Sequence, residues 1–289
     1  MSLRPSSYSP FQPLSVGNVV TVGLRLYRSH LKQYFLLSLR ASLWFLVPIY
    51  GWAKFFALSA LIARLGFQEL INQPETVSTA RTYINRRMWD FLACAVLVAI
   101  ALGVVVGIFV VAVLVLVLMG AAITAAVGPN LALIVSFVLL GFVAAMVLIL
   151  GLMWIGSRVM LAEIPLAIEA ETDAVKTIRR SWELTQSSVW RVMGIIGVAA
   201  LITLPLQMIV QIIATLVQYG PAVIARGESG MVVVLSFLAS YIIGVLGSAL
   251  VLPFWQSLKA ALYYDLRCRR EGLGLELPPP PESSPRPQE

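Results

Sequence analysis

Long apolar stretches alternate with short polar segments along this chain. Four of these stretches consist almost entirely of Val, Leu, Ala, Ile and Gly, and they run from Trp89 to about Ala122, from Leu131 to about Ile155, from Trp190 to about Tyr219 and from Met231 to about Trp255. About 20 apolar residues suffice to cross the hydrocarbon core of a bilayer as a helix. The pattern therefore predicts four transmembrane helices in two hairpins, which turn near Pro129 and Pro221.

A further apolar region, residues 35–72, is interrupted. It contains Arg40 and Lys54, and the sequence Pro-Ile-Tyr-Gly at 48–51 breaks it in the middle. One interpretation is a hairpin of two short spans, which gives six spans in three hairpins. Arms of about 15–18 residues are short for upright spans, however. The other interpretation is therefore a re-entrant or interfacial hairpin, or one span with a surface helix, beside four clear spans.

Three segments next to the apolar stretches have the periodicity of amphipathic helices. In the first, Ser15 is a predicted N-cap, and apolar positions recur at three- and four-residue steps with bases off that face. In the second, Ile178, Trp182 and Val189 share one face, and in the third, leucines recur every four residues from Leu258. Basic amphipathic helices are typical of segments that lie on a membrane surface.

The composition indicates a lipid environment. Of the 289 residues, 59% are hydrophobic and 12% are charged, and the mean hydropathy is +0.88. A soluble domain is about 45–50% apolar and about 25% charged, so this chain has too few polar groups to cover a water-facing surface. The net charge is +7. Because the bases flank apolar spans, they favour an anionic membrane surface over nucleic acid as the partner.

The basic residues gather in four polar segments, at the N-terminus, at 73–88, at 157–191 and near the C-terminus. The positive-inside rule places all four segments and both termini on the cytoplasmic side. Region 35–72 must then begin and end inside, which favours the six-span count. Residues 1–15 lack the apolar core of a signal peptide. We expect a flexible arm at 1–14, a single transmembrane helical domain at 15–272 and a disordered Pro-rich tail at 273–289.

The residue types that build catalytic and metal sites are scarce. The chain has one histidine, His30, and two cysteines, Cys94 and Cys268, without the spacing of metal ligands. The sequence contains neither a Ser/His/acid set away from that histidine nor a Gly-rich phosphate loop. We therefore expect no cofactor, no metal and no enzymatic activity.

Two sets of residues are candidates for function. In the leading hypothesis, a non-catalytic membrane protein, the first set contacts anionic headgroups, partner membrane proteins or further copies of the chain: Arg179, Arg180, Trp182, Trp190, Arg191, Asp265, Arg267 and Arg270. In the second hypothesis, a transporter or channel for a lipid or small amphiphile, the pathway comprises Arg40, Lys54, Gln207 and Gln211. Glutamines inside spans also bond neighbouring helices. A third hypothesis, an intramembrane lipid enzyme, lacks an acid/base cluster inside the spans.

Three segments resemble a known family. Residues 174–191 read AVKTIRRSWELTQSSVWR, residues 263–271 read YYDLRCRRE before Gly272-Leu273, and the segment from Ser15 through Tyr27 is a predicted amphipathic entry helix. Together they resemble the bacterial glycerophosphoryl diester phosphodiesterase membrane domain family over about 15–277. The resemblance implies a multi-span helical domain of a bacterial-type inner membrane. The family's phosphodiesterase barrel needs paired histidines and metal-binding acids, so we expect no catalytic residue to carry over.

Overall fold

The computed structural model describes residues 15–128, 130–170, 172–225 and 230–272, with the side chains of 222–225 left aside. The predicted arm 1–14, the predicted tail 273–289 and Pro129 lie outside these ranges. The described residues form ten helices and no strand. These helices are α1 (Val16–Ser29), α2 (Leu31–Trp44), α3 (Tyr50–Leu70), α4 (Val77–Arg86), α5 (Met88–Val127), α6 (Leu131–Val159), α7 (Glu163–Ile168), α8 (Ala174–Thr185), α9 (Val189–Ala225) and α10 (Gly230–Glu271).

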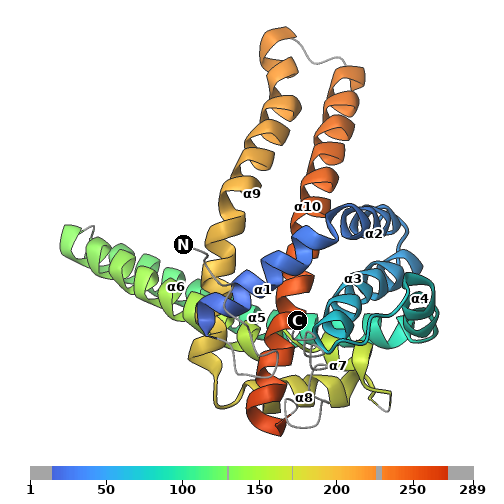
Figure 1. Cartoon of the computed structure of the whole chain (residues 1–289). Helices are drawn as coiled ribbons and strands as arrows, with labels where there is room; N and C mark the ends of the chain where they lie inside the picture. The colour runs from blue at the N-terminus through green and yellow to red at the C-terminus, as the bar shows by residue number, and fades with distance from the viewer. Residues whose placement is uncertain (1–14, 129, 171, 226–229, 273–289) are drawn as a thin grey trace, which may run out of the picture.

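Four helices, α5, α6, α9 and α10, are long and apolar enough to cross a membrane, which confirms the four long apolar helices predicted from the sequence. In the most apolar 18 residues of α5 and α6, 0% of positions are buried, and in α9 and α10 only 22% and 17% are. Both pairs form hairpins that project in different directions (Figure 1). Helix α9 ends later than expected, because it continues past Tyr219 and through Pro221 to Ala225.

The remaining helices pack together around the base of the two hairpins (Figure 1). We call this region the hub. It comprises α1–α4, α7 and α8 with the adjoining ends of α5 (to Cys94), α6 (from Ser157), α9 (to Ala199) and α10 (from Pro253), where the buried residues concentrate. The lower half of α10 lies at its centre, and Leu258, Leu262 and Leu266 are all buried there. The leucine periodicity at the end of α10 therefore faces protein.

Helix α1 begins where the sequence predicts. The hydroxyl of Ser15 accepts a hydrogen bond from the backbone N–H of Asn18 at 3.3 Å, as an N-cap should. Its apolar face, with Val19, Val20 and Leu26, is buried in the hub. This helix was expected to rest on the membrane surface. Periodicity shows that a face must be covered, and here the cover is largely the helix α10 and not lipid.

The interrupted region 35–72 forms two helices that turn at residues 45–49, as expected from Pro48. Helix α2 has 14 residues, or about 21 Å, which is short of the roughly 30 Å hydrocarbon core. Helix α3 is longer, but 12 of its 21 residues are buried in the hub. Neither α2 nor α3 is among the four helices that meet the length and hydropathy of a span, so the six-span count is not confirmed.

Candidate functional site

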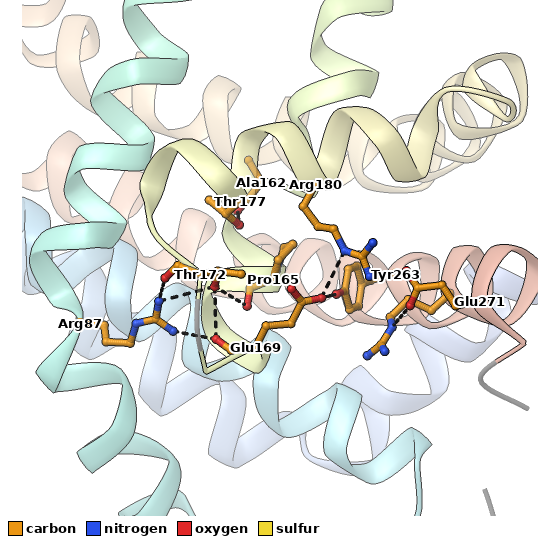
Figure 2. A network of polar contacts seen from close by, with 10 residues as sticks. Arg87, Ala162, Pro165, Glu169, Thr172, Thr177, Arg180, Tyr263 and Glu271 are labelled. Atoms are coloured by element: carbon orange, nitrogen blue, oxygen red, sulfur yellow. Dashed lines mark hydrogen bonds and ion pairs between the residues drawn. The ribbon is translucent and has the colours of Figure 1, made fainter. Parts of the chain in front are cut away.

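A polar network ties the α7–α8 segment to the rest of the hub (Figure 2). The guanidinium of Arg87 donates to the backbone carbonyls of Leu166 at 3.0 Å, Glu169 at 2.8 Å and Thr172. Carbonyls at a helix end have no partner within the helix. Arg87 supplies that partner at the end of the short helix α7, and so fixes the loop that leads to α8.

Glu169 links this loop to α10. Its carboxylate accepts a hydrogen bond from the hydroxyl of Tyr263 at 2.7 Å and pairs with Arg180 at 3.4 Å. Arg180 also pairs with Glu271, and Arg267 holds the same carboxylate at 2.8 Å. Partial burial opposes the charge on Arg180, but the carboxylates of Glu271 and Glu169 outweigh it and raise the pKa of the guanidinium. Arg180 therefore stays charged as an internal tie between α8 and α10.

Asp265 is a fully buried acid at the centre of the hub. Its carboxylate pairs with Arg191 at 2.9 Å and with Arg269 at 3.2 Å. Arg191 lies at the start of α9, and Arg269 lies one turn beyond Asp265 near the end of α10. The Asp265 carboxylate therefore joins the start of α9 to the end of α10. A buried charge is tolerated only when it is paired in this way.

The structure brings the first candidate set together around α8 and the adjoining ends of α9 and α10. Five members are tied into the hub: Arg180, Arg191, Asp265, Arg267 and Arg270, whose guanidinium donates to Glu183 and Ser187. Trp182 packs edge-on against Trp154 with ring centroids 5.7 Å apart. Arg179 pairs with Glu183 at 2.8 Å on the surface, and Trp190 is 81% exposed. Most of this set therefore stabilises the hub.

The second candidate set is not brought to one place. Gln207 and Gln211 line a cavity of about 450 Å³ between α9 and α10, and neither Arg40 nor Lys54 lines it. Arg40 is exposed on α2. The ammonium of Lys54 donates to the side-chain oxygen of Asn85 at 3.0 Å, which ties α3 to α4. The pathway that the transporter hypothesis requires is therefore not formed by these four residues.

A third set is a group of exposed bases, of which the sequence analysis had named only Arg40 as a candidate, and for a different role. Within the part of the chain that the structure describes, these side chains form no ion pair: Arg25, Arg28, Lys32, Arg40, Arg81 and Arg86. The sequence holds a signal for the first four, because no Asp or Glu precedes Glu69. Bases in a segment without acids cannot be neutralised locally, and this feature separates them from the bases of α8.

An exposed apolar patch lies beside Arg40. It comprises the end of α2, the α2–α3 turn and the start of α3, and its exposed members are Leu43, Trp44, Phe45, Leu46, Val47, Ile49, Tyr50 and Trp52. We call it the aromatic turn. Trp and Tyr are enriched where a protein meets the headgroup zone of a bilayer. Exposed aromatics next to an unpaired base are thus the side chains expected at a membrane interface.

Among the described residues, no group of three or more His, Cys, Asp or Glu residues is placed so that it could hold a metal ion. Two of the three segments that carry the family resemblance, 174–191 and 263–271, contact each other through Arg180 with Glu271 and Arg191 with Asp265. The resemblance itself stays a prediction. Comparison with known proteins finds no protein-family model, no curated protein and no solved structure that matches this chain.

Proposed function

We propose that this chain is a non-catalytic multi-pass membrane protein whose hub faces the cytoplasm and binds anionic lipid headgroups. In this proposal α5, α6, α9 and α10 cross a bacterial-type inner membrane. The aromatic turn of α2–α3 inserts into the interface without crossing. Four crossings return the chain to the side on which it started, and the positive-inside rule assigns that side, with the basic segments and both termini, to the cytoplasm.

The observation that carries the proposal is that exposed bases without an ion pair among the described residues occur on α1 and α2, next in the chain to the aromatic turn. Arg25 and Arg28 lie exposed on α1, and Lys32 and Arg40 lie exposed on α2, the helix that leads into this turn. Each base near an anionic membrane surface contributes about 1 kcal/mol of attraction. These four residues therefore replace most of the bases of α8 and α10 as the proposed headgroup contacts, because those bases are engaged within the protein.

A lipid-selectivity measurement tests the proposal. The full chain would be reconstituted in nanodiscs of phosphatidylcholine with a minor share of spin-labelled phosphatidylglycerol, and the relative association of the labelled lipid measured by electron paramagnetic resonance. We expect a preference for phosphatidylglycerol that falls as salt rises, because exposed charges are screened within about 10 Å at 0.1 M salt. Changing Arg25, Arg28, Lys32 and Arg40 together to Gln should lower this preference at least tenfold, because about 1.4 kcal/mol of their summed attraction already corresponds to a factor of ten.

Arg179→Gln is the matched control, since Arg179 is an exposed base that already has an acidic partner. Its lipid preference should equal that of the unchanged protein. Exposed substitutions of this kind change stability by only about 0.5 kcal/mol, so the fourfold variant should stay folded. An undiminished preference in that variant would refute headgroup binding by these bases. Copurification of a second protein that is lost in the same variant would instead identify a protein partner.

A further inference from the structure

An apolar crevice of about 630 Å³ opens where the two hairpins leave the hub. It is lined by α5 from Phe91 to Leu102, by the end of α6 and by facing residues of α9 and α10 such as Met193 and Trp255. Its volume falls within the roughly 300–1,000 Å³ of small-molecule sites. A Cβ added at Gly156 in its wall would meet no atom within 4 Å. The crevice is therefore open space at the junction of the hairpins.

The wall along α5 suits a hydrocarbon chain. Residues from Phe91 to Leu102 extend over about 16 Å of helix, and the lining there is formed by apolar side chains together with the thiol of Cys94. Several of these positions are only partly covered by protein. Since α5 has the length and hydropathy of a membrane span, the crevice faces acyl chains from which it can be filled laterally.

The hub end of the crevice is charged. The ammonium of Lys259 lies 2.5 Å from the carboxylate of Glu163, and both residues line the crevice. Their side chains are 20% and 18% exposed. The pair joins α10 to α7, although apolar residues would fill the same place at no desolvation cost. One anionic and one cationic group at the hub end of an apolar crevice define a complementary ligand with both charges.

We propose that the crevice binds one phospholipid with a zwitterionic primary-amine headgroup. An acyl chain lies along α5, the lipid ammonium pairs with Glu163 and the lipid phosphate pairs with Lys259. The ion pair between Glu163 and Lys259 is thereby replaced by two ion pairs with the lipid, and the occupied site carries no net charge. An anionic headgroup such as glycerol phosphate would set its phosphate against the Glu163 carboxylate, and a trimethylammonium group cannot donate hydrogen bonds to it.

This site shares with the proposed function only the premise that α5 and α6 lie in lipid. It uses none of the four bases assigned to general headgroup attraction, and it selects a different lipid. The two ideas can therefore fail separately when both lipids are measured on the same sample.

Native mass spectrometry of the detergent-purified full chain, equilibrated with phosphatidylethanolamine, phosphatidylcholine or phosphatidylglycerol, tests the site. We expect one retained phosphatidylethanolamine and weaker retention of the other two. Ala99→Phe places a ring in the crevice and should lower that retention by about tenfold. Ala101→Phe is the matched control, because Ala101 is an exposed residue two positions further along α5 that does not line the crevice.

Glu163→Gln removes the carboxylate but keeps the size of the side chain. It should reduce the preference for phosphatidylethanolamine over phosphatidylglycerol by about tenfold. Soluble phosphoethanolamine should not displace the lipid, since it lacks the chain. Equal retention by the Ala99→Phe and unchanged proteins would overturn the proposal, as would equal binding of the three lipids. Loss of phosphatidylglycerol enrichment in nanodiscs with phosphatidylethanolamine retention intact would overturn only the proposed function.

Discussion

The hub buries the same types of apolar side chain that the α5–α6 hairpin exposes. In the hub, Leu258 and Leu262 are 0% exposed, whereas Ile108 and Val138 of the hairpin are each 67% exposed. Apolar surface on this scale is not stable against water, where each Å² costs about 25 cal/mol. We interpret this difference as the effect of two solvents: the hub buries its apolar side chains against protein, and the hairpin exposes them, as a lipid environment would allow.

The charges divide the molecule at the same boundary. No Asp, Glu, Lys or Arg lies between Asp90 and Arg158, between Arg191 and Arg226 or between Glu228 and Lys259. Every ion pair among the described residues is formed by residues of the hub or of the loops within it. A charge is expensive in hydrocarbon and cheap when paired at a wet, partly buried site. The hub is thus stabilised by both polar and apolar contacts, and the hairpins by apolar contacts.

The largest effect should come from breaking the buried charge cluster of the hub. Asp265→Ala removes a fully buried carboxylate from Arg191 and Arg269, and leaves their positive charges without this counter-charge. Loss of one partner of a buried pair costs about 3–5 kcal/mol. We expect a large fall in the thermal unfolding midpoint of the detergent-solubilised protein, followed by tryptophan fluorescence.

Asp90→Ala is the control for this change. Asp90 pairs with Arg87 at 3.7 Å, but its side chain is 49% exposed, and exposed pairs contribute only about 0–1 kcal/mol. Its midpoint should stay close to that of the unchanged protein. Similar falls in both variants would mean that the Asp265 cluster is hydrated, and that the hub is not packed as described.

A charge placed in each region tests the two-solvent interpretation directly. Val147 on α6 and Val175 on α8 are similarly exposed, at 65% and 67%. Val147→Arg lies near the middle of α6 and should cost about 2.5–3.5 kcal/mol of insertion, whereas Val175→Arg should have almost no effect. Resistance of the membrane-bound chain to alkaline extraction measures the difference. If both variants remain in the membrane equally, α6 does not lie across the hydrocarbon core.

The sequence predicted the hairpins well because their signal is local. A run of 20 apolar residues identifies a span without knowledge of any partner, and the turn at Gly128 and the cap at Ser15 formed as expected. The packing of the hub was harder to predict, because it depends on contacts between residues that are distant in sequence. The apolar face of α1 is covered by α10, more than 200 residues later in the chain, and periodicity alone cannot distinguish a helix from lipid as the cover.

The candidate site was also hard to predict where it depends on partners that are distant in sequence. Arg180 of α8 looked available because its partner Glu271 lies 91 positions away in sequence. The unpaired bases of α1 and α2 carried a better signal, the absence of any acid before Glu69. The Glu163–Lys259 pair could not be anticipated, because its two residues come from segments 96 positions apart. Charge balance within a segment is therefore a better guide to an available base than charge clustering.

The smallest predicted effect concerns how tightly α1 is packed against α10. A Cβ at Gly23 would lie 2.9 Å from the Cα of Leu258, an atom of the backbone that cannot rotate away. Gly23→Ala should therefore separate the two helices slightly and cost about 1–3 kcal/mol, as overpacking does. Gly17 lies in the same helix, and a Cβ there would meet no atom within 4 Å. Gly17→Ala should instead stabilise the helix by about 0.5–1 kcal/mol. Opposite shifts in thermal unfolding would show that α1 belongs to the protein-packed region. Two stabilising shifts would mean that α1 is detached from α10 and rests on the membrane, which would move the boundary between the two regions into the hub itself.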